Sequence, residues 1–285
     1  MIFCYISIFL LNLMLLVQPL KQSQKVFDMK ERINRFRESI VRIIVDNEPK
    51  GTGFVVSKDG LIATCFHVVQ KTEPLSNNTT SITYALNIEI EFTNGLRLPA
   101  FIHGSCLNKG FSEAVSKDYC ILKVNQNDLI PLKLGSFSDA KEGDIVYMGG
   151  YPFGITQPIF AKGMLSTKWK TTGYLNQDEE RDVAWLDITM NKGNSGGPII
   201  LLSDNPNNDK VIGIASFMLN PFAEPAERIF NFVQGTGGEV LILGVSFREF
   251  AKHVNLALMN ISLGIGGCVS IDYLKSKIIQ NNNTK

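Results

Sequence analysis

The chain has few histidines and little net charge, and each shortage excludes a class of function. Only three histidines, His67, His103 and His253, occur among 285 residues, and no Cys/His cluster has the spacing of a zinc site. We therefore predict that the protein binds no metal ion and no other cofactor. The formal net charge is +1, with acids and bases interspersed, so we expect no surface that binds nucleic acid.

Cysteine is also scarce, and its pattern gives no disulfide framework. Cys106 and Cys268 have no evident partner, and Cys65 and Cys120 stand near His67 and Asp118, which would bring them close together. Buried free thiols are favoured over structural cross-links. We therefore predict no structural disulfide. The five are Cys4, Cys65, Cys106, Cys120 and Cys268.

The N-terminus carries the longest apolar run of the chain. Residues 2–17 are apolar except for Ser7 and Asn12, a length that suits a signal-peptide core and is slightly short for a membrane span. No Lys or Arg precedes this run, and several follow it. Three interpretations stay open: an export signal, a membrane anchor, or a true start at Met29. The first two are favoured, and the third would leave the protein in the cytoplasm.

The most informative segment is the hexapeptide Gly-Asn-Ser-Gly-Gly-Pro at residues 193–198. It places Ser195 between glycines, which allow a sharp turn and a close approach by a substrate carbonyl. The backbone N–H groups of Gly193 and Ser195 are then the expected donors of an oxyanion hole. A serine in such a turn becomes a nucleophile only with a base and an orienting acid nearby.

The chain supplies a candidate base and a candidate acid. His67 ends an apolar segment, Thr64-Cys-Phe-His-Val-Val, and Asp118 begins another, Asp-Tyr-Cys-Ile-Leu-Lys-Val. Taken singly, each residue has a plainer explanation: a core histidine, a turn aspartate and a turn serine. Together they predict acyl transfer, in which Ser195 attacks, His67 carries the proton and Asp118 orients His67.

Four motifs together give a family resemblance. The segments Gly51-Thr-Gly-Phe-Val-Val-Ser, Thr64-Cys-Phe-His-Val-Val, Asp118-Tyr-Cys-Ile-Leu-Lys-Val and Gly193-Asn-Ser-Gly-Gly-Pro resemble those of trypsin-like serine peptidases of the HtrA type. The resemblance runs from about residue 38 to residue 273. It implies a serine endopeptidase that cleaves polypeptides, with protein quality control as its setting. The alternative is a catalytically silent protease fold that binds partners and is tethered by its N-terminus.

The chain pattern predicts an all-β fold, because many short strands alternate with turn residues. The resemblance implies two packed antiparallel six-stranded barrels. We expect a leader over 1–24, a short helix over 25–37, a first barrel over 38–135 and a second over 136–285. Because the sequence stops at Lys285, we expect this chain to differ from most HtrA proteins in having no PDZ domain.

The insertion at residues 218–263 departs from the HtrA pattern. Apolar residues recur at helical spacing after Ser246, which predicts an amphipathic helix. Two interpretations stay open: a helix that covers the barrel and one that gates the substrate. We expect a further short helix from Tyr273 to close the domain.

Substrate preference is predicted from the resemblance. The implied S1 floor is Thr189, the strand facing the substrate backbone is Ser216-Phe217-Met218, and Gly267 lies in the opposite wall. None of these residues is charged, so we predict cleavage after small or medium aliphatic side chains. Asn194 stands where zymogens have an aspartate, so we expect no activation cleavage, and loop 151–158 is the expected control point. The sequence predicts no oligomeric state.

Overall fold

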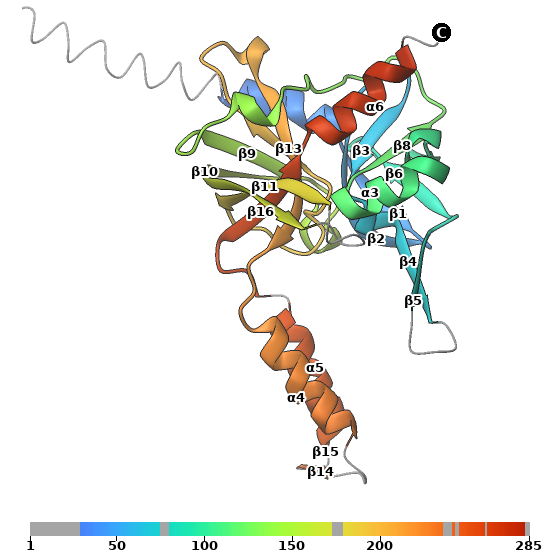
Figure 1. The fold of residues 1–285 in the computed structure, drawn as a ribbon, viewed down its shortest axis with the longest axis vertical. Helices are drawn as coiled ribbons and strands as arrows, with labels where there is room; N and C mark the ends of the chain where they lie inside the picture. Colours follow the sequence, from blue (N-terminus) through green and yellow to red (C-terminus); the bar gives the residue numbers. More distant parts are fainter. Residues whose placement is uncertain are drawn as a thin grey trace, which may run out of the picture.

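The computed structural model describes residues 29–74, 80–172, 179–235, 241–242, 245–259 and 261–282. Two closed antiparallel barrels of six strands each lie side by side (Figure 1). This arrangement confirms the predicted all-β fold. No helix within the described ranges is long and apolar enough to span a membrane. The predictions for the apolar leader lie outside these ranges.

The first barrel contains β1, β2, β3, β8, β7 and β6, in that order around the sheet. Its β6–β7 hairpin turns at Asn94-Gly95, where Gly95 has a φ of +85° and the Asn94 side chain accepts from the Leu96 N–H. Every residue of β1 is buried, so both faces of this strand are covered by other parts of the protein. The strands are β1 (Ile40–Val45), β2 (Glu48–Val55), β3 (Leu61–Thr64), β6 (Ile88–Glu91), β7 (Arg97–Ile102) and β8 (Cys120–Val124).

The second barrel has the order β10, β11, β16, β13, β12, β9. It encloses its own apolar cluster, while a larger cluster fills the first barrel and reaches across the contact between the two. The strands are β9 (Ile145–Gly150), β10 (Ile159–Thr172), β11 (Glu180–Asp187), β12 (Pro198–Leu201), β13 (Lys210–Met218) and β16 (Ile265–Ser270).

Several short helices and the β4–β5 hairpin lie beside the barrels, while α4, α5 and the β14–β15 hairpin belong to the insertion (Figure 1). A helix over residues 29–39 leads into β1; the lead-in helix was predicted over 25–37. The remaining helices are α2 (Phe66–Val69), α3 (Phe111–Lys117), α4 (Ala223–Gly235), α5 (Phe247–Met259) and α6 (Asp272–Asn282). The two-stranded hairpins are β4 (Gln70–Pro74) with β5 (Thr80–Tyr84), and β14 (Leu241–Ile242) with β15 (Val245–Ser246).

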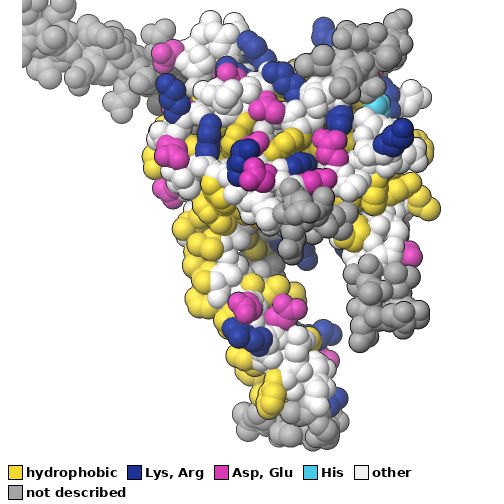
Figure 2. Space-filling model, in the orientation of Figure 1, with side chains coloured by type: hydrophobic (Ala, Val, Ile, Leu, Met, Phe, Trp, Pro, Cys, Tyr) yellow, Lys and Arg dark blue, Asp and Glu magenta, His cyan; other side chains and the backbone are white. Residues whose placement is uncertain are grey.

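The insertion has two helices where the sequence predicted one. These helices, α4 and α5, pack against each other and project away from the barrels as an arm (Figure 1). Small or medium side chains, Ala226, Val233 and Ala251, are buried in this arm, while Ile229 and Phe232 stay exposed. Figure 2 shows hydrophobic side chains along its surface.

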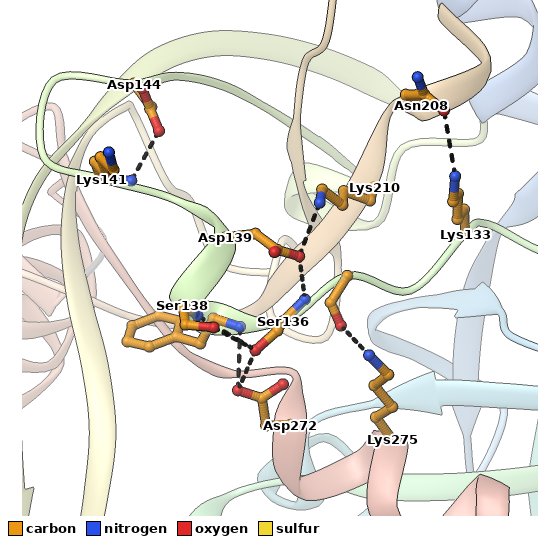
Figure 3. A network of polar contacts seen from close by, with 12 residues as sticks. Lys133, Ser136, Ser138, Asp139, Lys141, Asp144, Asn208, Lys210, Asp272 and Lys275 are labelled. Atoms are coloured by element: carbon orange, nitrogen blue, oxygen red, sulfur yellow. Dashed lines mark hydrogen bonds and ion pairs between the residues drawn. The ribbon is translucent and has the colours of Figure 1, made fainter.

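The linker between the barrels is held by polar contacts (Figure 3). Asp272, at the start of α6, accepts from the Ser136 hydroxyl and from the Phe137 N–H, both at 3.1 Å. Asp139 pairs with Lys210 of β13 at 2.9 Å. The C-terminal helix α6 therefore holds in place the segment around Ser136 that leads into the second barrel.

All four described cysteines, Cys65, Cys106, Cys120 and Cys268, are buried free thiols. This confirms the prediction for them, and Cys4 lies outside the described ranges. Cys65 and Cys120 are near neighbours in the first barrel, because Thr64, the residue before Cys65, is the strand partner of Cys120.

Candidate active site

His67 and Asp118 meet because the strands that carry them are neighbours. His67 lies on the short helix α2 directly after β3, and Asp118 directly precedes the residues that enter β8. His67 Nδ1 is 3.0 Å and 2.9 Å from the two carboxylate oxygens of Asp118, and the His67 backbone N–H donates to Oδ1 at 3.1 Å. Three contacts thus fix the orientation of the imidazole relative to the acid.

The electrostatics of the pair favour an ionised acid. Asp118 is only 1 % exposed, and burial raises its pKa, but the charge of His67 and hydrogen bonds from His67 and Ser216 lower it below the usual range. Burial conversely lowers the pKa of His67, and the negative charge and hydrogen bond of Asp118 outweigh that effect and raise it. Asp118 therefore stabilises a protonated imidazole, as a base in acyl transfer requires.

We expect a pH profile that follows from this raised pKa. A histidine base acts in its neutral form, so peptidase activity is lost as pH falls through the pKa of His67. Because that pKa is raised, the acid limb of kcat/KM is expected above the ordinary histidine value of about 6.5. Measuring kcat/KM from acidic to alkaline pH checks this, and an acid limb below the ordinary value would contradict it.

Ser216 has a role that the sequence analysis missed. Its buried hydroxyl donates a hydrogen bond to Oδ2 of Asp118, so it positions the acid from the second barrel. Ser216 was predicted only as part of the strand that faces the substrate. No local motif indicates the additional contact, because the two residues lie 98 positions apart.

The turn that carries Ser195 is held against the first barrel. The Ser195 carbonyl accepts from the Thr52 N–H at 2.8 Å, and the Gly196 N–H donates to the Ala215 carbonyl at 2.7 Å. The same Ala215 carbonyl accepts from Cys65 Sγ at 3.1 Å, two residues before His67. These contacts bring the backbones around Ser195 and His67 together. Within the described ranges no hydrogen bond joins Ser195 Oγ to His67.

The backbone N–H groups of Gly193 and Ser195 were predicted to form the oxyanion hole. The Lys192 carbonyl accepts from the Phe153 N–H at 2.6 Å. The Lys192 carbonyl and the Gly193 N–H belong to the same trans peptide group and point in opposite directions. The Gly193 N–H therefore points away from Phe153. In the described part of the chain, neither Gly193 N–H nor Ser195 N–H donates to a protein acceptor. Both donors are thus left for a substrate carbonyl.

Thr52 links the turn to the first barrel, which the sequence did not indicate. Its hydroxyl donates to the Gly193 carbonyl at 2.6 Å and accepts from the Tyr151 N–H at 2.9 Å. The predicted control loop at 151–158 is therefore joined to the turn twice, through Thr52 and through the contact between Phe153 and Lys192.

Gly196 gives a prediction about stability. Its φ is +87°, and a Cβ there would fall on the Thr52 carbonyl oxygen and the Thr64 hydroxyl. We expect Gly196→Ala to lower the free energy of unfolding by about 3 to 5 kcal/mol, through backbone strain and overpacking. Gly95, with a φ of +85° and nothing within 4 Å of its Cβ position, is the matched control. Gly95→Ala is expected to cost about 1 kcal/mol, and equal losses in urea unfolding would contradict the steric argument.

An apolar cavity of about 340 Å³ opens beside Ser195. Ser216, Phe217 and Met218, which were predicted to bind the substrate, line it. The other lining residues are Met190, Asn191, Lys192, Asn194, Leu256 and Met259.

Two residues predicted for this cavity do not line it. In place of Thr189 the structure puts the next residue, Met190, whose side chain packs against Gly266. Gly267 is covered by the ring of Phe217, which is held edge-on against Trp185 with ring centroids 4.9 Å apart. The cavity floor is thus formed by larger side chains than the sequence analysis assumed, and it still carries no acidic group.

One group in the described ranges gathers potential metal ligands. Three potential ligand atoms lie within 4.8 Å of one another, one each from Cys65, His67 and Asp118. Burial raises the pKa of Cys65 well above its ordinary value, so the thiol stays protonated and donates to Ala215. Asp118 is already engaged by His67 and Ser216. These contacts serve proton transfer better than metal binding.

Comparison with known proteins identifies the family. The family model described as trypsin-like peptidase domain matches residues 51–214. The chain belongs to the trypsin-like peptidase family. Serine protease HTRA4 of Homo sapiens is 32% identical over 228 residues, which covers 78% of this chain and 42% of that protein. A probable periplasmic serine endoprotease, DegP-like, of Rickettsia conorii is 26% identical over 202 residues, covering 68% and 35%.

Solved structures show the same fold. The HtrA-type protease AlgW with tripeptide has a TM-score of 0.54 and 19% identity, covering 87% of this chain and 61% of that one. The Rv3671c protease in its inactive form has a TM-score of 0.55 and 18% identity, covering 88% and 92%. The present chain therefore has an HtrA-type protease domain. It spans about two fifths of the length of HTRA4.

Proposed function

We propose that the protein is a serine endopeptidase that hydrolyses polypeptides through an acyl-enzyme. The observation that supports this most directly is the hydrogen-bonded pair of the exposed His67 and the buried Asp118. This pair lies next to a turn whose Gly193 and Ser195 N–H groups have no acceptor within the described part of the chain. The HtrA-type relatives support polypeptides as the substrate class.

The proposed mechanism uses residues from both barrels. Ser195 Oγ attacks the scissile carbonyl while His67 takes its proton, and the carbonyl oxygen becomes negative and accepts from Gly193 and Ser195. His67 then protonates the leaving amine, and water hydrolyses the acyl-enzyme by the same route. Asp118, held by Ser216, stabilises the imidazolium at both stages.

We further propose cleavage after an apolar residue. The cavity beside Ser195 is walled by Met190, Phe217 and Met218 and has no acidic group, so a Lys or Arg side chain would be buried without a partner. Catalysis would reside in the two barrels at 38–135 and 136–285. The silent binding module remains the alternative, together with a leader that anchors or exports the chain.

Reaction with a fluorophosphonate probe tests the proposal. These reagents label a serine only when its base and oxyanion hole are functional. Stoichiometric labelling of the full chain at Ser195, located by peptide mass mapping, is the expected result. A folded chain that stays unlabelled across neutral and alkaline pH would favour the silent binding module.

A further inference from the structure

The arm formed by α4 and α5 begins and ends at the wall of the candidate substrate cavity. It joins β13 to β16, and these strands pair at Phe217 with Gly267 and at Met218 with Gly266. Leu219 continues this pairing by donating its N–H to the Ile265 carbonyl at 3.1 Å. The base of the arm is therefore an extension of the strands that line the cavity.

A polar contact fixes the end of α5 at this base. The side-chain amide of Asn220 donates to the Leu258 carbonyl at 2.9 Å, and its oxygen accepts from the Phe222 N–H at 3.0 Å. Asn220 thus ties the last turn of α5 to the segment that leaves β13. Leu256 and Met259, on either side of Leu258, are held in place by this contact.

Leu256 faces two cavities at once. With Met259 it lines the cavity beside Ser195, and it also lines a second cavity of about 370 Å³ beside Gly193. The other lining residues of the second cavity are Pro49, Lys50, Phe153, Gly154 and Lys192. The two cavities share Lys192 and Leu256, and Leu256 is the shared residue that the inserted arm supplies.

The exposure of Leu256 indicates a surface for contact with substrate. Its side chain is 58 % exposed, while the residues buried within the arm are Ala226, Val233 and Ala251. A large aliphatic side chain that is mostly exposed contributes little to the stability of its own helix pair. Covering it with a substrate side chain would instead favour binding.

We propose that Leu256 is a specificity-determining residue, which separates the cavity for the acyl-side residue from the cavity for the leaving-group residue. The inserted arm is then part of the substrate-binding cleft, and the preferred substrates carry apolar side chains of limited size at the scissile bond. The inference rests on the proposed endopeptidase activity. Met259, in the same wall, limits the depth of the acyl-side cavity.

Peptide-library profiling of three full-length proteins tests this proposal. Leu256→Ala joins the two cavities, so the ratio of kcat/KM for Phe over Val before the scissile bond is expected to rise about tenfold. Leu256→Met keeps the volume and is expected to leave the ratio within about twofold of wild type. Ile229→Ala removes a similar side chain from the exposed surface of α4 and is the matched control, with no change expected.

The outcomes separate the inference from the proposed function. An unchanged profile in a Leu256→Ala protein that still reacts with the fluorophosphonate probe would overturn the inference alone. An equal shift in Ile229→Ala would also overturn it, because the effect would then belong to the arm as a whole. If wild type neither cleaves peptides nor reacts with the probe, both proposals fail.

Discussion

Replacing Ser195 with alanine is expected to lower kcat by about a million-fold, leaving only slow background hydrolysis. The change removes the proposed nucleophile, so no acyl-enzyme can form, while the oxyanion donors and the cavity remain. Ser195 is partly exposed at the cavity, so the variant is expected to fold with unchanged stability. Initial rates on a fluorogenic peptide measure the loss.

Ser276→Ala is the control for this substitution. Ser276 lies on α6 with an exposed hydroxyl that donates to the Tyr273 carbonyl, far from the candidate site in the sequence. Wild-type kcat is expected for that variant. Substantial hydrolysis by a purified Ser195→Ala protein would show that another group is the nucleophile.

Asp118→Asn is expected to lower kcat by about ten-thousand-fold with little change in KM. Asp118 has a φ of +57°, a left-handed conformation that asparagine tolerates, so the backbone should keep its shape. The amide carries no negative charge and cannot stabilise protonated His67. The residual activity is therefore expected to have its acid limb at lower pH than the wild-type limb, because the raised pKa of His67 depends on Asp118.

The matched control for that variant is Asp46→Asn. Asp46 also has a positive φ, +51°, and its exposed carboxylate pairs with Lys71 at the surface. Wild-type kcat and an unmoved acid limb are expected. An acid limb that stays in place in Asp118→Asn would mean that the environment of His67, and not the charge of Asp118, sets its pKa.

The barrels could be predicted from the sequence because their determinants are local. Short runs of apolar residues and a turn at Asn94-Gly95 are enough to indicate strands and an all-β fold. Their closure into two barrels was implied by the family resemblance that the four motifs carry. The insertion was harder. Its first helix, α4, follows Pro221 and carries Pro225 in its first turn, a pattern that resembles a loop although proline is tolerated there.

The candidate site was predictable only as far as its motifs extend. His67, Asp118 and Ser195 stand in characteristic segments, whereas Thr52 and Ser216 act on residues about 100 or more positions away. Contacts between residues so far apart in the sequence produce no local motif that could be recognised. Thr189 was assigned to the cavity by counting back from Ser195, but the turn at 191–194, closed by the Asn194 N–H on the Asn191 carbonyl, brings Met190 there instead.

The hydrogen bonds that Thr52 and Ser216 make across the two barrels have a consequence for biosynthesis. A ribosome releases the first barrel before the second exists, and domains fold in that order as the chain emerges. At that stage Asp118 lacks Ser216, and the turn at Gly193 does not yet have its anchor on Thr52. The second barrel closes only when β16 pairs with β11 and β13, near the C-terminal end of the chain. A nascent chain of this design therefore cannot assemble the complete site until β16 has been synthesised.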